Sequence, residues 1–223
     1  MERIGSFMPS DFEYRPPTVP WLTTIHQDRD MVVLDKPAGL LSIPGKTHND
    51  SALSRVLGEH PHAYAVHRLD MDTSGIMVIA LRRKAEAELQ RQFRMREVRK
   101  CYVALVWGHL AAADGIIDAP LLRVPGQPPR SVIDLIDGRA AQTEYKVVGR
   151  EGDCTRVELR PLTGRSHQLR VHMLSLGHPI VGDRFYGPTR TASPNRLHLH
   201  AQGLGLKHPF SGEPLNFEAL APF

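Results

Sequence analysis

The feature of this 223-residue sequence that most limits its fold is a polar turn, His67 to Gly75, that runs directly into an apolar segment. The segment from Gly75 to Leu81 (GIMVIAL) has the length and the β-branched residues of a buried strand. Two aspartates and an arginine in the turn (HRLDMDTSG) would then lie at the mouth of that strand, where a chemical site can form. Asp, Thr, Ser and Gly are also common in ordinary surface turns, so the turn alone leaves both interpretations open.

Strand patterns outnumber helix patterns along the chain and do not alternate regularly with them. We expect strands at residues 21–25, 31–34, 75–81, 101–107, 143–148, 155–159, 197–200 and 215–218. We expect helices at 51–59, with Asp50 as a possible cap, at 82–100 and at 164–177. Residues 111–139, with scattered Gly and Pro, should be rich in loops. This pattern predicts an α+β fold with a mixed, largely antiparallel sheet.

Three features of the sequence bear on where the protein is found in the cell. Residues 1–20 are rich in proline and lack the apolar core of a signal peptide, so we expect a flexible arm before a domain that spans 21–223. No apolar run approaches the roughly 18 residues of a membrane span. Cys101 and Cys154 lie far apart and match no metal spacing, which favours a reduced, cytoplasmic protein.

Positive charge is concentrated in one segment. The chain carries a net charge of +4, and residues 82–100 alone hold eight Lys or Arg against three Glu. Ala85, Leu89 and Phe93 fall at helical spacing, so the segment can form an amphipathic helix with its basic side in water. A solvated helix face would have the same pattern, but such concentration also favours a polyanionic partner.

Two short motifs resemble nucleotide or phosphate sites. The stretch Gly39–Thr47 has five residues between its glycines where a phosphate-binding loop has four, and Pro44 removes one backbone donor. The stretch Asp70–Thr73 spells the DxDxT of aspartyl-phosphate phosphotransferases. In those enzymes an apolar strand precedes the first aspartate, whereas here the strand follows it. The phosphotransferase is the second candidate, and it requires magnesium.

The twelve histidines raise the question of a metal site. His198 and His200 share a strand face, and His60 and His62 flank a proline. No HExxH motif and no Cys/His framework is present, so core or solvated histidines account for them better.

The helix expected after Gly164 places charged residues away from its apolar stripe. At about 100° per residue, Leu169, Met173 and Leu176 point one way and form a core stripe. His167 and Arg170 lie on the opposite side, and Arg165 and Gln168 lie at the flanks. Arg170 is therefore either solvated or faces a cleft, where a guanidinium can orient a carboxylate.

Several ordered motifs together resemble the RluA family of pseudouridine synthases. His67–Asp70 with Thr73–Gly75 is similar to the family signature HRLDxxTSG, and the resemblance extends from about Trp21 to the C-terminus. It is closest to the short branch of the family that lacks an S4-type RNA-binding domain. The other matching stretches are 35–40 (DKPAGL), 100–104 (KCYVA), 164–172 (GRSHQLRVH) and 178–183 (HPIVGD).

The resemblance implies a catalytic domain over 21–223 whose two halves flank an RNA-binding cleft. Asp70 would be the catalytic aspartate, Tyr102 the aromatic residue that packs on the target base, and Arg170 the partner of Asp70. Arg68 would fill the gap left by the extracted nucleotide. The other residues expected to bind substrate are His67, Arg165 and His167. The stretch 130–138 (RSVIDLIDG) departs from the family in having two aspartates where more basic residues are expected.

The implied activity is the isomerisation of uridine to pseudouridine in structured RNA loops, in 23S ribosomal RNA, in the anticodon arm of tRNA, or in both. The reaction breaks the N1–C1′ bond and joins C5 to C1′. An ionised carboxylate can attack C1′ or remove a proton at C2′, and the Tyr102 hydroxyl could assist the removal of the C5 proton. The target has to be flipped out, and residues 82–100 would hold phosphates. No metal, organic cofactor, membrane or protein partner is implied, and we expect a monomer. The alternative is a module that only binds RNA.

Overall fold

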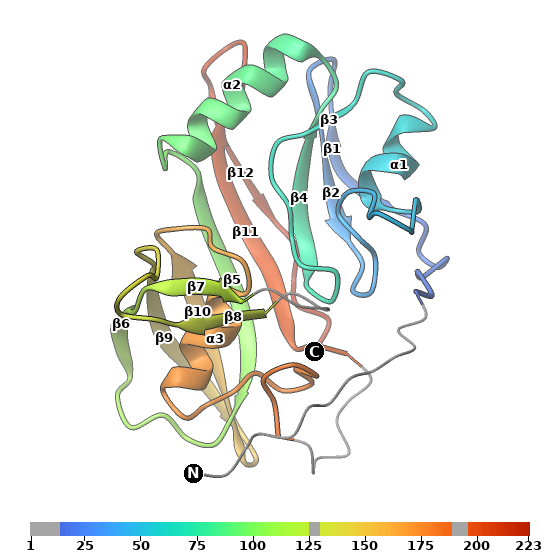
Figure 1. Cartoon of the computed structure of the whole chain (residues 1–223). Helices are drawn as coiled ribbons and strands as arrows, with labels where there is room; N and C mark the ends of the chain where they lie inside the picture. The colour runs from blue at the N-terminus through green and yellow to red at the C-terminus, as the bar shows by residue number, and fades with distance from the viewer. Residues whose placement is uncertain (1–13, 125–129, 189–195) are drawn as a thin grey trace.

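The computed structural model describes residues 14–124, 130–188 and 196–223, which form twelve strands and three helices (Figure 1). The first half of the chain contains β1 (Thr23–Gln27), β2 (Met31–Lys36), α1 (Ala52–Leu57), β3 (Tyr64–Ala65), β4 (Ser74–Ala80), α2 (Arg83–Arg94) and β5 (Arg99–Trp107). The second half contains β6 (Asp114–Asp118), β7 (Leu121–Val124), β8 (Arg130–Ile133), β9 (Gln142–Glu151), β10 (Cys154–Pro161), α3 (Gln168–Ser175), β11 (Leu199–Lys207) and β12 (Pro214–Glu218).

Ten of the strands form one sheet that branches at its centre. The main order is β1-β2-β4-β11-β5-β10-β9-β6, while β3 pairs with β4, β12 pairs with β11, and β7 with β8 forms a separate hairpin. Among the described strands, β4 and β11 are the one parallel pair, and they meet only at His200↔Ser74 and Ala201↔Gly75. The two strands then diverge. This confirms a mixed, largely antiparallel sheet in two halves that join at one point.

Gly75 makes this junction possible. Its φ is +110°, a value that L side chains rarely adopt, and a Cβ at this position would lie 2.3 Å from the Ala201 carbonyl oxygen. The polar turn that carries Asp70 ends directly before the junction. The position at which the sheet divides is therefore also the position of the candidate site.

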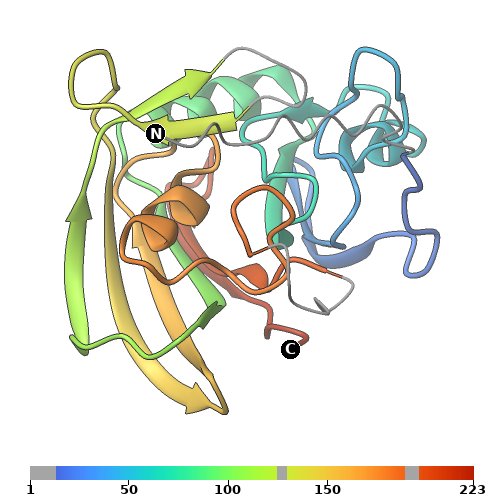
Figure 2. The ribbon, with the colours of Figure 1, turned by 60° about the horizontal axis from the view of Figure 1, so that its bottom comes forward.

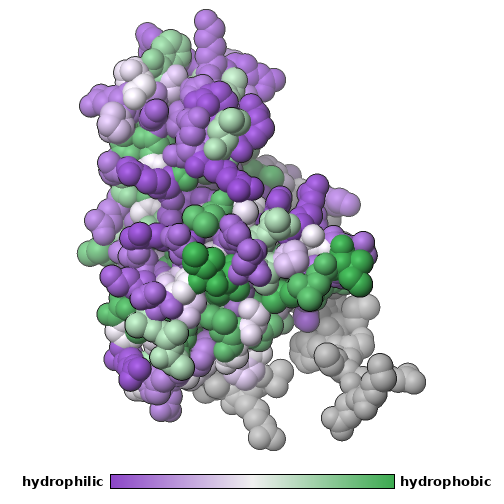
Figure 3. Space-filling view, turned by 90° about the vertical axis from the view of Figure 1, so that its left-hand side faces the viewer, coloured by the Kyte–Doolittle hydropathy of each residue, from purple (hydrophilic) through white to green (hydrophobic). Residues whose placement is uncertain are grey.

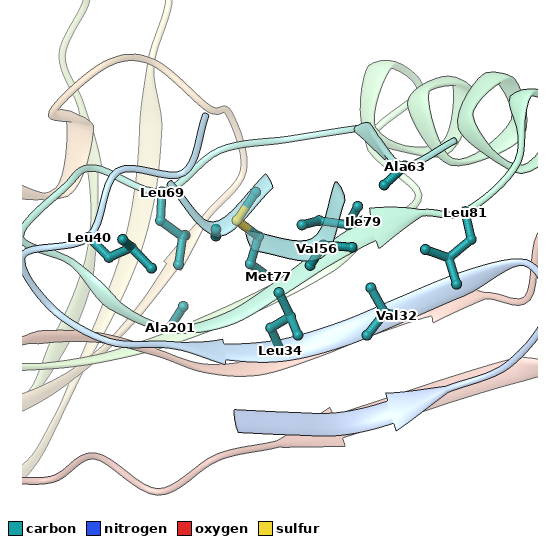
Figure 4. Packing of buried hydrophobic residues seen from close by; sticks show 11 residues of the cluster. Val32, Leu34, Leu40, Val56, Ala63, Leu69, Met77, Ile79, Leu81 and Ala201 are labelled. Atoms are coloured by element: carbon teal, nitrogen blue, oxygen red, sulfur yellow. The ribbon is translucent and has the colours of Figure 1, made fainter. Parts of the chain in front are cut away.

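The apolar run of β4 is explained by burial on both faces. Met77 and Ile79 pack with Leu34 of β2 and with Val56 of α1 (Figure 4). The alternate residues of β4 pack in a separate cluster with Leu89 of α2. All seven residues of β4 are buried, which is why the segment reads as a continuous apolar stretch. A third cluster joins β5, β10 and α3 in the second half.

Each of the eight expected strands overlaps a strand of the structure, and the stretch 111–139, expected to be rich in loops, also holds short strands. It contains β6 and the β7–β8 hairpin. These strands have four or five residues, and most of their side chains are exposed, so they lack an apolar alternation that would identify them.

The helices differ from expectation in several details; α2, for example, ends at Arg94 rather than at residue 100. The cap of α1 is Ser51, whose hydroxyl accepts a hydrogen bond from the Ser54 amide, whereas Asp50 binds Arg55. Helix α3 begins at Gln168 rather than Gly164, because His167 has a φ of +55° and cannot continue a helix backwards. Its expected single stripe was wrong: residues 168–173 are all buried. The side chain of Arg170 is 2% exposed, whereas Leu176 is 39% exposed.

The described part of the expected arm contacts the body of the protein. The Tyr14 hydroxyl donates to the Asp50 carbonyl and accepts from the Leu41 amide. Arg55 donates to the carbonyl of Pro17 and stacks on the Trp21 ring. Residues 14–20 are thus held against the loop that follows β2, and residues 1–13 lie outside the described chain. No helix in the described chain combines the length and the apolarity that a membrane crossing requires.

Candidate active site

A cleft of about 2230 Å³ lies where the two halves of the sheet meet. Its lining comes from the Asp70 turn, the end of α2, the start of β5, the β7–β8 hairpin, α3 and the loop after Asp183. In Figure 2, α3 (orange) and the β7–β8 hairpin (yellow-green) both lie in the second half of the molecule, next to the loop that follows Asp183. The cleft is thus built from segments far apart in sequence, since its lining also includes Leu41 and residues of β11 and β12 up to Glu218.

The cleft is strongly basic, while the rest of the chain is not. Eleven arginine or lysine side chains line it, against five aspartates or glutamates. The remaining sequence has more acidic than basic residues, since the whole chain carries only +4. Figure 3 shows a face on which polar residues predominate, with apolar groups between them. The charge of the protein is therefore concentrated where the two halves meet, as a polyanion site requires.

Only the C-terminal end of the basic segment 82–100 contributes basic side chains to the cleft. Within α2, Arg83 pairs with Glu86 and Arg91 pairs with Glu88, and Arg91 also pairs with Glu97 after the helix. Arg82 pairs with Asp30. The four basic residues of the segment that line the cleft are Arg94, Arg96, Arg99 and Lys100. The expected phosphate-binding surface thus begins where α2 ends.

The turn that carries Asp70 is held by the loop that follows β2. The buried hydroxyl of Ser42 donates to the Leu69 carbonyl at 2.8 Å and accepts from the Leu69 amide at 3.0 Å. The Gly39 amide donates to the Met71 carbonyl at 2.9 Å. Both neighbours of Asp70 therefore have backbone groups that are fixed by residues about 30 positions earlier.

Lys36 completes this support from inside the protein. Its buried ammonium donates to the carbonyls of Pro37, Leu40 and Met71 at 2.9, 2.7 and 3.1 Å, which uses all three of its donors. Burial lowers the pKa of Lys36 to about 7, although the nearby Asp72 and Asp70 oppose this shift. The Lys36 contacts link the loop after β2 directly to the Asp70 turn.

The predicted meeting of Asp70 and Arg170 is present, with one partner that the sequence did not reveal. Arg170 Nη1 lies 3.4 Å from Asp70 Oδ2. Its Nε and Nη2 donate to the two carboxylate oxygens of Asp183, each at 2.7 Å. The Asp183 side chain is 0% exposed, while that of Asp70 is 24% exposed. Asp183 therefore anchors the guanidinium, and Asp70 faces the cleft beside it.

Asp183 was missed because it lies in a loop with no periodic pattern. The stretch 178–183 (HPIVGD) was among the matching motifs, and its final aspartate was the available signal. A buried arginine in α3 needs a buried anion to neutralise it, so the unexpected burial of Arg170 would also have pointed to such a partner.

His167 lies between the second half of the sheet and Asp70. Its Nδ1 is 2.8 Å from the Tyr186 hydroxyl, and its Nε2 is 3.9 Å from Asp70 Oδ2. Burial lowers the pKa of His167, and the charge of Asp70 only partly offsets this. A neutral His167 beside Asp70 leaves Arg170 as the cation that neighbours the carboxylate.

Tyr102 lies on β5 and is half-buried in the cleft wall. Burial raises the pKa of its hydroxyl well above the usual value near 10, and the charge of Asp70 raises it further. The hydroxyl therefore stays protonated at neutral pH. In that state it can donate a hydrogen bond, but it is a poor base for a carbon-bound proton.

The remaining predicted binding residues all line the cleft, in different environments. Arg68 is exposed. The Nε2 of His67 accepts the Val78 amide at 2.9 Å, and its ring stacks on Phe93 at 4.5 Å between centroids. Burial lowers the pKa of His67 to about 3, so this ring is neutral and is bound to the fold on one side. Arg165 Nε donates to the Ala140 carbonyl at 3.2 Å.

The alternative motifs find less support in the geometry. Asp72 of the DxDxT sequence pairs with Arg184 at 3.0 Å, and an arginine there opposes a magnesium ion. Among the described residues, the one group with metal-like spacing is Asp28, Asp30 and His208, which does not line the cleft. Asp28 already accepts the amides of Asp30 and Met31. His200 is buried and bonded to Ser74.

Comparisons with known proteins agree with one another over most of the chain. The family model described as RNA pseudouridylate synthase matches residues 30–175. A protein of Escherichia coli strain K12, the dual-specificity RNA pseudouridine synthase RluA, is 51% identical over 214 residues, which are 94% of this chain and 98% of that protein. The protein of the same name from Haemophilus influenzae is 47% identical over 215 residues, with 95% and 98% coverage.

Solved structures agree with the sequence comparison. The human RNA pseudouridylate synthase domain containing 1 superimposes with a TM-score of 0.79 and 30% identity, covering 94% of this chain and 87% of that one. The human RNA pseudouridylate synthase domain containing 4 superimposes with a TM-score of 0.73 and 29% identity, covering 90% of this chain and 88% of that one.

Proposed function

Because this chain belongs to the RluA family of RNA pseudouridine synthases and isomerises uridine to pseudouridine in RNA, we propose that Asp70 carries out the reaction. The observation that supports this role is the position of its carboxylate. It faces a basic cleft and lies 3.4 Å from a guanidinium that Asp183 holds in place. A polyanionic substrate would be drawn into the cleft by charge and would meet this carboxylate at the junction of the sheet halves.

The reaction conserves all atoms of the nucleotide. The N1–C1′ bond breaks and its electron pair passes to the uracil, which then turns so that C5 can bond to C1′. The proton on C5 leaves, and N1 gains a proton. Asp70 starts the sequence in one of two ways, and both require an ionised carboxylate. It attacks C1′, and the bond between them breaks when C5 bonds to C1′, or it removes the proton at C2′, which returns to C2′ at the end. Arg170 places a positive charge 3.4 Å from that carboxylate.

Neighbouring side chains have roles in holding the everted nucleoside. Tyr102 offers a flat face to the uracil and a protonated hydroxyl, and the exposed Arg68 occupies the gap that the target leaves in the RNA. Arg165 and His167 bind the nucleotide near Asp70. His67 shapes this part of the wall, because its Nε2 is occupied by the Val78 amide.

The basic rim sets the class of RNA. Arg94 and Arg96 at the end of α2 and Lys100 in β5 bind phosphates, which gives affinity that depends on salt and little on sequence. Flipping is easiest for a uridine that is already in a loop. We therefore place the substrates among stem-loops of ribosomal RNA and the anticodon arm of tRNA, with a cytoplasmic monomer as the acting form.

The replacement of Asp70 by Asn tests the proposal. Asp70→Asn should yield no pseudouridine in an anticodon stem-loop or a ribosomal RNA hairpin while binding the same RNA with nearly unchanged affinity. Asp153→Asn, at the exposed β9–β10 turn, is the matched control and should keep wild-type yield. Product would be mapped with a pseudouridine-specific chemical probe, with and without a chelator. Wild-type yield from Asp70→Asn would remove Asp70 from the mechanism, and a pseudouridine yield lost in chelator would show that the reaction needs a metal ion.

A further inference from the structure

The cleft contains a second aromatic surface that the proposed mechanism does not use. Phe185 lines the cleft in the loop after Asp183, and its ring is half-buried. The ring of His167 lies nearly parallel to it, with an interplanar angle of 15° and 5.8 Å between centroids. Tyr186 meets it edge-on at 84°.

The position of this ring is fixed from below. The Phe185 amide donates to Asp183 Oδ1 at 2.9 Å, and the same carboxylate binds Arg170. The Arg170 guanidinium lies 5.1 Å from the ring centroid and is itself buried. Because Asp183 and Arg170 are both fully enclosed, the ring is presented to the cleft on a rigid base.

Two exposed arginines that line the cleft lie over the ring. The guanidinium carbons of Arg184 and Arg130 lie 5.2 and 5.6 Å from the ring centroid, and both side chains are exposed and line the cleft. An aromatic face bordered by guanidinium groups is the combination with which proteins hold unstacked nucleobases, since the ring stacks and the cations meet the backbone.

We propose that Phe185 is a stacking platform for one nucleobase of the RNA loop other than the target uridine. This inference rests on the proposed function only in that RNA enters the cleft. Tyr102 on β5 faces the target uracil in that proposal, so Phe185 offers a second, separate face. A phenyl ring has no hydrogen-bond donor or acceptor, so it can stack with any base. The platform would recognise that a loop nucleotide is unstacked rather than which nucleotide it is.

The test is a double-mutant cycle that combines substitution of Phe185 with removal of single bases from the RNA loop. All proteins carry Asp70→Asn so that no turnover occurs, and dissociation constants are measured for a labelled anticodon stem-loop. A set of loops each lacks one base, with an abasic site at every loop position except the target. Phe185→Leu should weaken binding of the intact loop by about 5- to 150-fold, the range found for loss of one stacked base.

The diagnostic result is coupling at one position. One abasic site should weaken binding to the parent protein by the same factor as Phe185→Leu and cause no further loss in that variant. Phe185→Tyr keeps the ring and should restore both effects. Phe210→Leu, which removes an exposed phenyl ring outside the cleft lining, should leave every dissociation constant unchanged.

Two outcomes would overturn the platform. An unchanged dissociation constant in Phe185→Leu would show that no base stacks there. Losses that simply multiply at every loop position would show that Phe185 acts through the fold around Arg170. Neither outcome depends on catalysis, so a failure of the platform is distinct from a failure of Asp70, which is read from product yield.

Discussion

The guanidinium of Arg170 is shared by two carboxylates, and we predict that the two have opposite roles. Asp183 is fully enclosed and makes two hydrogen bonds of 2.7 Å to the guanidinium. It also accepts the amides of Phe185 and Tyr186 at 2.9 and 3.1 Å. Asp70 makes one longer contact and faces the cleft. We therefore expect Asp183 to carry stability and Asp70 to carry catalysis.

The magnitude follows from burial. Removing one partner of a buried ion pair destabilises a protein by about 3–5 kcal/mol. Asp183→Asn keeps one carbonyl oxygen, and Asp70 remains as a second anion, so the lower end of that range applies. For a protein of this size, about 3 kcal/mol corresponds to a fall in Tm of about 6–12 °C. Asp70→Asn removes a partly exposed, longer contact and should change the free energy of unfolding by less than about 1 kcal/mol.

Thermal unfolding of the two variants and of the wild type, followed by circular dichroism, measures this contrast. Product formation is assayed well below the lower Tm, so that both variants are folded. Asp183→Asn should retain part of the activity, whereas Asp70→Asn should have none. A Tm of Asp183→Asn within 2 °C of wild type, or a larger loss for Asp70→Asn, would refute the assignment of Asp183 as the anchor.

Three further predictions concern the support of the site. Ser42→Ala leaves two backbone groups next to Asp70 without their partner, so the carboxylate should be misplaced and kcat should fall by about tenfold to a hundredfold. The control is Ser51→Ala, which removes a helix cap worth about 1 kcal/mol. It should leave kcat unchanged in the same steady-state assay. Gly75→Ala should prevent assembly of the β4–β11 junction, seen as low soluble yield or a Tm at least about 6 °C lower, since a Cβ there meets backbone at 2.3 Å; a well-folded alanine variant would contradict this. The pKa of His67 is lowered to about 3, so below about pH 6.5 the unfolded chain binds a proton that the folded chain does not, and stability is lost as the pH falls. His67→Gln should reduce that loss by up to about 1.4 kcal/mol per pH unit in urea denaturation between pH 6.5 and 4.5, and parallel pH profiles of the two proteins would contradict it.

The parts of the fold that could be predicted are those in which local pattern and final burial agree. Strand β4 is buried on both faces, so its apolar residues are continuous in sequence. The β9–β10 pair is long and alternating in its second strand, and it was expected at residues 143–148 and 155–159. The short, exposed strands of the β7–β8 hairpin carry no such signal, because tertiary contacts rather than their own residues select the conformation.

The site shows the same division between local and distant causes. The turn of Asp70 was recognisable because its motif is continuous, and Arg170 was expected to pair with it through the resemblance. The burial of Arg170 could not be read from helical periodicity, because α3 is enclosed on nearly all sides and its charged residue is neutralised by a loop 13 residues later. The hydrogen bonds from Ser42 and Lys36 to the turn connect segments about 30 residues apart, and no short sequence motif indicates such contacts.

The junction at Gly75 has a mechanical consequence for the encounter with substrate. Strand β11 is hydrogen-bonded to β4 on one side and to β5 on the other, so a single backbone network crosses from one half of the molecule to the other. Closing one half around a substrate would bend this network at the two residue pairs that join β4 and β11. An RNA loop that deforms to fit the cleft instead loses conformational entropy of its own. The flexibility of an RNA loop, more than its nucleotide sequence, would then decide which RNAs are modified.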